Sequence, residues 1–450
     1  MTDELKRQFK EQGVDETFIR QVILPEYGLE HYPRTINYDL DTLAHRSLSL
    51  ESKLVILTVY NGTETQRGKT LARCVIKDQK KRTRQSLWNG DEAKDPYERY
   101  RLEHRILTLL DDIPVVHNDD NFFRIFMKQA DGSLDCLLNE TNRHLVHAET
   151  ASGVEAQPAV YYRTLGRAHI RTALHSLVSV CGRMTEVADE LKQTKLSIDE
   201  KSLQSRQEKL AKQLRTVTEK SLENVPSSQR DEVLTLLGDR LQPGTSLTNE
   251  LRSLAQYLVD GNQIIHYDPR ASNFLYTNID GFSHEKLPAA DRLKITLCDF
   301  GSVRKGPFSH DLAFFLSDPY VLSFYKSKSE RRLLYRYGMT RALPMLRTTE
   351  ERYANLTAQD ETFANSRDRD FVHATIVALL ERTANPIELE RRNPRDYQKY
   401  IGERKLETTD ALINGNLSIF ANFTDTKAFG GIKFIIRKIQ SARANLSSTP

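Results

Sequence analysis

The first part of the chain shows two apolar patterns, one helical and one typical of strands. In residues 1–33 the apolar positions follow helical spacing, which predicts an N-terminal helical extension. Downstream, stretches rich in Val, Ile and Thr predict three strands: Arg34–Leu40, Lys53–Tyr60 and Thr70–Lys77. Asn61-Gly62 is a turn pair between the second and third stretches, so we expect these two to pair as a hairpin.

A single helical pattern interrupts this strand-rich region. Residues 96–110 carry apolar side chains at helical spacing. Strand character returns at Pro114–Val116 and Phe122–Met127, and Gly132-Ser133 then ends the last strand. The first 138 residues are therefore expected to form a small sheet with one embedded helix.

The middle of the chain, residues 140–260, has a helical pattern throughout. Within it, residues 186–223 are strongly charged, and leucines recur at seven-residue spacing. The residue three positions after each of these leucines is polar: Asp199, Arg206 and Gln213. A coiled coil needs apolar residues at these positions, so the pattern does not predict one. We expect this stretch to form a solvent-exposed helical hairpin.

Two short apolar stretches follow residue 260. Gln263–His266 and Leu293–Cys298 predict strands, with a polar loop around 278–291 between them. From Asp311 to the C-terminus the pattern is again helical, and no internal repeat is visible.

Composition places the chain among ordinary globular proteins. Its 450 residues are 39% hydrophobic and 28% charged, which is enough for a core without disulfides or metals. The net charge of +4, from 65 basic and 61 acidic residues, excludes a bulk polycation that packages nucleic acid. The four cysteines stand 45 or more residues apart, which argues against a disulfide scaffold or a zinc site and favours a cytoplasmic protein. The acidic N-terminal residues predict no signal peptide.

Two motifs carry the strongest chemical signal. One has the form His-x-Asp-x4-Asn, from His266 to Asn273, and the other is Asp299-Phe300-Gly301, which begins 26 residues after Asn273. Each follows an apolar stretch that predicts a strand. In this order and setting, the motifs resemble those of the protein-kinase-like superfamily of phosphotransferases. Phosphoryl transfer needs a carboxylate beside the acceptor hydroxyl and a divalent cation on the nucleotide phosphates.

The resemblance implies a role for each motif residue. Asp268 would be the catalytic carboxylate, and Asn273 and Asp299 would be ligands of Mg2+, which prefers hard oxygen donors. Arg270 would neutralise the transferred phosphate, and His266 would support the loop.

A lysine upstream extends the resemblance. Cys74-Val75-Ile76-Lys77 ends the third predicted strand and is similar to the kinase strand whose lysine contacts the nucleotide phosphates. That lysine is normally paired with a glutamate of the next helix. Glu103 is the expected partner in this chain, with Glu98 as its rival.

The nucleotide-facing segments match the family less closely. Residues 126–134 resemble a kinase hinge, in which Met127 would lie behind an adenine ring and Gln129 would belong to the segment facing it. No Gly-x-Gly-x-x-Gly motif is present. The loop that would cover the phosphates, Asp41–Leu50, contains no glycine, and the hydroxyls of Ser47 and Ser49 are the expected substitutes.

The segment after Asp299-Phe300-Gly301 points to a compact branch of the superfamily. Only nine residues, Ser302–His310, separate it from Asp311-Leu312-Ala313, and no Ala-Pro-Glu follows. This is similar to aminoglycoside phosphotransferases and to lipopolysaccharide-core and sugar kinases, in which the later aspartate supports the catalytic loop. Asp311 is the candidate for that role.

The resemblance implies an α+β, two-lobed kinase-like fold with a small antiparallel-sheet N-lobe, a helical C-lobe and a helical insertion. We expect five segments: an N-terminal helical extension at 1–33, an N-lobe at 34–138, a helical insertion and start of the C-lobe at 139–245, a catalytic C-lobe at 246–345 and a helical C-terminal extension at 346–450.

The implied activity is ATP- and Mg2+-dependent transfer of the γ-phosphate to a hydroxyl acceptor, such as a sugar, a lipid-linked sugar or a protein side chain. Two alternatives stay open. One is a pseudokinase scaffold or regulator, suggested by the glycine-free phosphate loop, and the other is transfer of AMP or another group on the same fold.

Three basic runs interrupt the otherwise balanced charge. Residues 66–84 carry eight basic residues and one acidic residue, a net charge of +7, and residues 326–341 carry six and one, a net charge of +5. The last run, Lys427–Arg443, is either a helix packed on the body or a basic amphipathic helix lying peripherally on an anionic membrane. The runs and the helical insertion are also candidate surfaces for a protein partner. Aromatic platforms of the kind that bind nucleic acid are not evident.

Overall fold

The computed structural model describes residues 2–42, 52–63, 66–79, 96–111, 113, 115–121, 123–150, 156–193, 202–261, 263–279, 287–325, 327–342, 360–392, 394, 417 and 429–447. The chain divides into two compact units. The small unit is Met1–Asp131 with Cys298–Gly301, and the large unit is Gly132–Leu297 with Ser302–Pro450. An antiparallel sheet forms the centre of the small unit, and helices dominate the large unit. The predicted α+β class, with a small antiparallel sheet in one unit and mainly helices in the other, is therefore confirmed.

Five strands make up the sheet of the small unit, in the order β1-β2-β3-β5-β4. Their bounds are β1 Ile36–Thr42, β2 Ser52–Gly62, β3 Arg67–Gln79, β4 Val115–Asp119 and β5 Arg124–Lys128. The predicted hairpin is confirmed, because β2 and β3 pair antiparallel up to Gly62, which lies opposite Arg67; Asn61 and Gly62 are the last residues of β2. Their register places Leu54 opposite Lys77.

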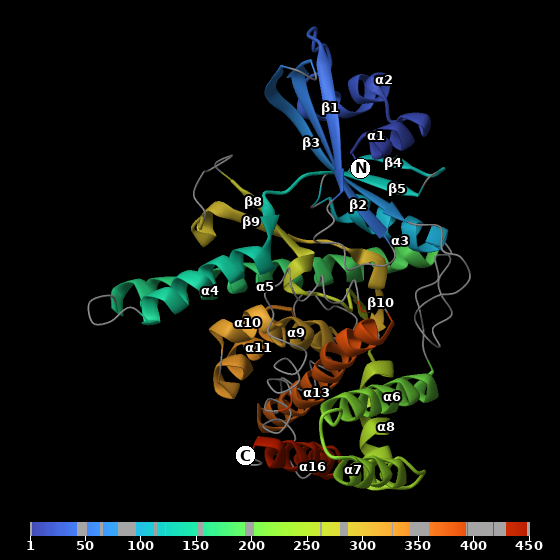
Figure 1. The fold of residues 1–450 in the computed structure, drawn as a ribbon, viewed down its shortest axis with the longest axis vertical. Coiled ribbons are helices and arrows are strands. Elements are labelled where there is room, and N and C mark those ends of the chain that lie inside the picture. Colours follow the sequence, from blue (N-terminus) through green and yellow to red (C-terminus); the bar gives the residue numbers. More distant parts are fainter. Residues whose placement is uncertain are drawn as a thin grey trace. The chain divides into compact units, whose positions relative to one another are not determined.

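The N-terminal segment covers one face of this sheet (Figure 1). It consists of α1 (Thr2–Glu11), α2 (Glu16–Phe18), a π-helical turn (Ile19–Ile23) and a 3-10 turn (Pro25–Tyr27). Phe9, Ile19 and Ile23 are buried there against Val55 and Cys74. Because side chains alternate along a strand, this packing leaves the neighbouring residues of β2 and β3, Lys77 among them, on the other face.

Helix α3 (Pro96–Leu110) lies between β3 and β4 in the sequence and fits the predicted helix. Its apolar positions Tyr100, Leu102, Ile106 and Leu107 are buried, which is the helical spacing that the sequence shows. Glu103 is buried in the same helix, and a buried carboxylate requires a partner.

The large unit contains the remaining long helices. They are α4 Leu134–Thr150, α5 Ala156–Gln193, α6 Leu203–Ser221, α7 Ser227–Arg240, α8 Ser246–Val259, α9 Phe308–Leu316, α10 Pro319–Phe324, α11 Lys328–Ala342, α13 Asp360–Arg392 and α16 Gly430–Ser447. One apolar core joins residues of α6, α7, α8, α13 and α16, which gather in the lower part of Figure 1. No helix within the described residues is both long enough and apolar enough to cross a membrane.

The prediction of an exposed hairpin over residues 186–223 is wrong for its second half. Helix α6 buries Leu210, Leu214 and Val217 in the core of the large unit. The polar residues Arg206 and Gln213 are buried as well. A buried helix face that includes polar residues has an incomplete apolar stripe, so its sequence resembles that of a solvated helix.

The C-terminal basic helix, α16, packs on the body of the large unit. Its apolar residues Ile432, Ile435, Ile436 and Ile439 are buried in the shared core. The Glu250 carboxylate of α8 accepts hydrogen bonds from the backbone N–H groups of Gly431 (2.7 Å) and Ile432 (2.8 Å), at the start of the helix. A carboxylate at a helix N-terminus satisfies donors that the helix itself leaves unpaired.

Short strands of the large unit carry the loops with the two motifs. A three-stranded sheet has the order β6-β8-β9, formed by Gly132–Ser133, Phe274–Asn278 and Leu293–Leu297. A separate pair joins β7 (Gln263–Ile265) to β10 (Arg304–Gly306). The His-x-Asp-x4-Asn segment connects β7 to β8, and Asp299 follows the end of β9.

Candidate phosphotransfer site

Three charged residues of the small unit meet around one ammonium group. Lys77 Nζ lies 2.6 Å from Glu103 Oε1, 2.8 Å from Glu103 Oε2 and 2.6 Å from Asp299 Oδ1. Both Lys77 and Glu103 are buried. Burial alone would lower the pKa of the Lys77 ammonium, but Asp299 and Glu103 outweigh it and raise that pKa above its usual range. Lys77 therefore remains a cation. The contact is made by Glu103; the side chain of its rival Glu98 lies outside the described residues.

Asp299 occupies an unusual backbone position. Its φ angle is +66°, in the left-handed region that L-residues other than Asn, Asp and Gly rarely adopt. Its side chain is 42% exposed, whereas those of Lys77 and Glu103 are buried. Its Oδ1 contacts Lys77, while the side chain as a whole stays partly exposed to solvent. Backbone strain of this kind concentrates at functional sites.

The sheet face that carries Lys77 is apolar and only partly covered within the small unit. Val75 shares this face on β3, and the cross-strand pairs place Ile56 of β2 and Met127 of β5 beside Val75. Ile56 and Val75 are half-buried. An apolar, half-covered strip leading to a buried ammonium suits a flat ring with phosphates at one end.

In the segment predicted as a hinge, Gln129 has one polar group with a hydrogen-bond partner and one without, within the part of the chain that the structure describes. Its backbone N–H donates to the carbonyl of Arg73 (3.0 Å), so this group continues the ladder between β3 and β5. Its side-chain Oε1 is buried and has no hydrogen-bond partner among the described residues. A buried acceptor of this kind requires a donor. The predicted phosphate-loop residues Ser47 and Ser49 lie outside the described residues.

In the large unit, the loop from His266 to Asn273 is held by its own side chains. Arg270 Nε donates to Asp268 Oδ1 (2.6 Å), and Asn273 Nδ2 donates to the backbone carbonyl of Asp268 (2.8 Å). The His266 ring accepts from the backbone N–H of Asp268 through Nδ1 (3.3 Å). The hydrogen bond made by Asn273 uses its amide nitrogen. Its amide oxygen, the atom that would bind a metal, does not take part in this bond.

Two carboxylates hold the same loop through its backbone. Asp311 accepts from the N–H of His266 (2.7 Å) and of Tyr267 (2.8 Å), and Asp318 accepts from the N–H of Ala271 (3.0 Å). Asp311 is fully buried on α9. Charge-assisted bonds to backbone N–H groups are stronger than neutral ones, so they fix the loop firmly.

Sequence reasoning missed a second group of residues at this loop. Tyr267 projects into a buried cluster with His310 of α9, Glu381 of α13, and Arg206 and Lys209 of α6. Glu381 and Lys209 lie 172 positions apart, and no local spacing connects either of them to the motifs. Within the sequence, the signal for this group is that His310 directly precedes Asp311, the predicted support of the loop.

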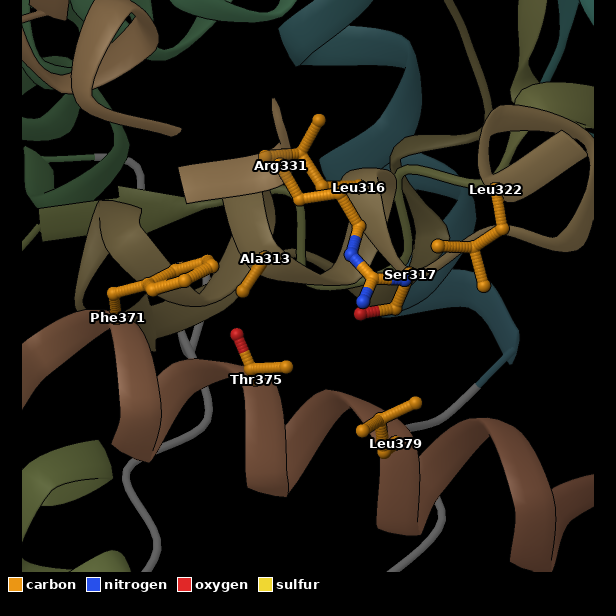
Figure 2. A pocket seen from close by; sticks show the side chains of 8 residues that line it. All are labelled: Ala313, Leu316, Ser317, Leu322, Arg331, Phe371, Thr375 and Leu379. Carbon is orange, nitrogen blue, oxygen red and sulfur yellow. The ribbon is translucent and has the colours of Figure 1, made fainter. Parts of the chain in front are cut away.

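A separate pocket of the large unit lies where α13 packs on α9 (Figure 2). Phe371, Thr375 and Leu379 of α13 form one side of it. The other lining residues are Ala313, Leu316, Ser317, Leu322 and Arg331. None of the site residues predicted from the sequence lines this pocket.

Comparisons with known proteins were made at three levels. No protein-family model matches the chain, and no curated protein matches its sequence. Similar solved structures include an ethanolamine kinase from Plasmodium vivax, with 13% identity over 91% of both chains and a TM-score of 0.43. A choline kinase from Cryptosporidium parvum has 10% identity over 86% of this chain and 90% of its own, with a TM-score of 0.42. The GDP complex of wild-type aminoglycoside 2'-phosphotransferase-IIIa has 11% identity over 90% of this chain and 100% of its own, with a TM-score of 0.42.

Proposed function

We propose that the protein is an ATP-dependent phosphotransferase that moves the γ-phosphate to a hydroxyl group of an acceptor. The observation that carries the proposal is the Lys77 ammonium, buried in the small unit between Glu103 and the partly exposed Asp299. In the motif order that resembles the protein-kinase-like superfamily, a lysine, a glutamate and an aspartate in these positions hold the nucleotide phosphates and the divalent cation on them.

The nucleotide would use the face of the sheet that carries Lys77. Its base would lie on the apolar strip of Ile56, Val75 and Met127, and its phosphates would reach Lys77. The buried Oε1 of Gln129 lacks a donor among the described residues, and an exocyclic amino group of the base would provide one.

The donor types of the two predicted ligands, taken separately, suit a magnesium ion. In the small unit, Asp299 has a partly exposed side chain that ends in a carboxylate. In the large unit, Asn273 has an amide oxygen that its bond to Asp268 does not use. Mg2+ favours oxygen donors of these two kinds, and when bound it would neutralise charge on the nucleotide phosphates.

Asp268 is the proposed acceptor of the hydroxyl proton. Arg270 binds Asp268 Oδ1 at 2.6 Å and thereby orients the carboxylate. The neutralisation of the transferred phosphate by Arg270, expected from the sequence, would require this pair to open or to be shared, since the guanidinium has further N–H donors.

The binding part of the proposal is tested by calorimetry with MgATP on the full chain. Lys77→Ala and Asp299→Ala are each expected to weaken binding by at least about tenfold, because each removes a charge that the phosphates or the metal would meet. Lys69→Ala is the matched control, since Lys69 is an exposed lysine of the same strand. No binding of MgATP by the unaltered protein, or equal binding by Lys77→Ala, would contradict the proposal.

The transferred group is tested with ATP labelled at either the α or the γ phosphorus, incubated with a lysate that supplies acceptors. Label from the γ position on an acceptor supports phosphoryl transfer. Label from the α position would identify AMP transfer, and binding without any transfer would identify a pseudokinase. The class of acceptor, which we propose to be a sugar, a lipid-linked sugar or a protein, is read from the labelled product.

A further inference from the structure

Tyr267 stands between His266 and Asp268 and connects the catalytic loop to the interior of the large unit. Its φ angle is +70°, a conformation that a tyrosine rarely adopts. Its side chain is buried, and its ring stacks on that of His310, with 4.5 Å between centroids and 14° between planes. The guanidinium of Arg304 lies over the same ring, 3.4 Å from its centroid.

The hydroxyl of Tyr267 binds a glutamate from the C-terminal part of the chain. Tyr267 Oη donates to Glu381 Oε1 at 2.5 Å. The same carboxylate contacts His310 Nε2 at 3.2 Å and Lys209 Nζ at 3.1 Å. Glu381 is buried, so it has exchanged its hydration for these three partners.

The charges of this cluster keep Glu381 ionised. Burial alone would raise the pKa of the Glu381 carboxyl, but Lys209 and His310 outweigh it and hold that pKa well below its usual range. Arg206 of α6 also bonds to Tyr267 Oη, at 3.2 Å. A buried carboxylate that contacts several cations and one phenol has few alternative arrangements, so it holds the Tyr267 side chain in one position.

We propose that Glu381 is a positioning residue for the catalytic loop: by holding Tyr267, it maintains the backbone that presents Asp268. This inference rests on the proposed phosphotransfer. Tyr267 is fixed at two levels, because Asp311 binds its backbone N–H while Glu381 binds its hydroxyl and His310 stacks on its ring. A strained φ angle persists only where the surroundings determine it in this way.

The inference changes the role of two segments that lie outside the motifs. Helix α13 supplies Glu381, and α6 supplies Lys209 and Arg206. Both helices would therefore belong to the catalytic apparatus as supports of the loop, and not only to the core of the large unit.

The experiment compares Glu381→Gln and Tyr267→Phe with a matched control, Glu388→Gln. Glu388 lies on the same helix and pairs with Lys212 of α6 at 3.4 Å, but it is not among the groups that contact Tyr267. In the γ-phosphate transfer assay, we expect kcat to fall by about 10- to 100-fold in the two test variants, as for other small misplacements of a reacting group. The Kd of MgATP should change less than kcat, because Lys77 and Asp299 belong to the small unit and only Asn273, among the proposed metal ligands, lies on the loop. Glu388→Gln should leave both values unchanged.

A second readout does not depend on activity. Hydrogen–deuterium exchange of a peptide covering residues 264–275 reports the backbone N–H groups of His266, Tyr267 and Ala271, which are bonded in this structure. Faster exchange in Glu381→Gln and Tyr267→Phe, with the α16 peptide unchanged, supports the inference. Exchange equal to that of the unaltered protein, or a loss of protection over the whole large unit, overturns it. If the unaltered protein transfers no γ-phosphate, the proposed function fails, and the exchange data still decide whether Glu381 holds the loop.

Discussion

The Lys77 ammonium lies 2.6 Å from the Asp299 carboxylate, although the two residues stand 222 positions apart in the chain. Glu103 contacts the same ammonium from α3, so two carboxylates share one cation. The pair with Glu103 is buried, and the pair with Asp299 is partly open to solvent. The two pairs therefore have different expected roles: the buried pair with Glu103 chiefly concerns stability, and the partly exposed Asp299 is the proposed metal ligand.

Removal of the Lys77 cation should lower the stability of the fold and should also weaken nucleotide binding. In Lys77→Met, the buried Glu103 carboxylate loses the cation that lies 2.6 Å away, and we expect the free energy of unfolding to fall by about 3–5 kcal/mol. Urea denaturation of the full chain measures this change. The double variant Lys77→Met with Glu103→Gln should recover part of the loss, because the uncompensated charge is then absent. A double variant less stable than the single one would contradict this account.

Asp299 should control the dependence of nucleotide binding on magnesium. In Asp299→Asn the amide cannot neutralise a divalent cation. We therefore expect the factor by which Mg2+ increases the affinity for ATP to be at least about tenfold smaller than in the unaltered protein. Calorimetric titrations of ATP at several Mg2+ concentrations measure this. Asp291→Asn is a suitable control, since Asp291 lies in a surface turn before β9. Equal magnesium dependence in Asp299→Asn and in the unaltered protein would exclude Asp299 as a ligand.

The stability of the protein should decrease in the alkaline range because of His310. Burial alone would lower the pKa of this histidine, but the nearby carboxylates of Asp311 (3.6 Å) and Glu381 (3.2 Å) raise that pKa to about 9. The folded state therefore binds this proton more tightly than the unfolded chain, whose histidines have a pKa of about 6.5. The resulting stabilisation is fully present below pH about 6.5 and is lost as the pH rises through about 9.

The matching measurement is urea denaturation between pH 6 and 10, as assay conditions, for the unaltered protein and for His310→Gln. The difference between their unfolding free energies should shrink by up to about 3 kcal/mol across this range, which corresponds to the shift of the histidine pKa. Parallel pH profiles for the two proteins would show that His310 is not a cation in the folded state.

The start of α16 should depend on Glu250. Its carboxylate accepts the N–H groups of Gly431 and Ile432, both in buried surroundings. Glu250→Ala should cost about 1–3 kcal/mol, because it leaves two donors without their partner. Glu232→Ala is the control, since Glu232 pairs with Lys438 of the same helix but is 67% exposed. That change should cost less than about 1 kcal/mol.

Local patterns predicted the elements whose residues interact with near neighbours in the sequence. The β2–β3 hairpin followed from its turn and its β-branched residues, and helix α3 followed from its apolar spacing. Glu103 was expected as the partner of Lys77 only from the resemblance, which left Glu98 as its rival. Lys77 and Asp299 were predicted to act together only because the order of motifs resembles a known superfamily. The physical contact between them could not be read from either segment alone.

The residues that escaped prediction share a physical cause. Arg206 and Gln213 are buried polar residues, and a sequence pattern assigns such residues to the surface. Glu381 lies on a helix with no motif, and its significance comes only from the tertiary contact with Tyr267. Polar interactions between distant segments leave no periodic signal, so these contacts become visible only in the structure.

Cys298–Gly301 belongs to the small unit, whereas the residues on either side of it belong to the large unit. The small unit is thus formed by two segments of the chain that are far apart in the sequence. A chain that ended at Asp131 would keep Lys77 and Glu103 but would lack Asp299. Recombination of residues 1–131 alone could therefore not transfer the complete ion-paired group, and a block that includes Asp299 must also carry most of the first half of the large unit.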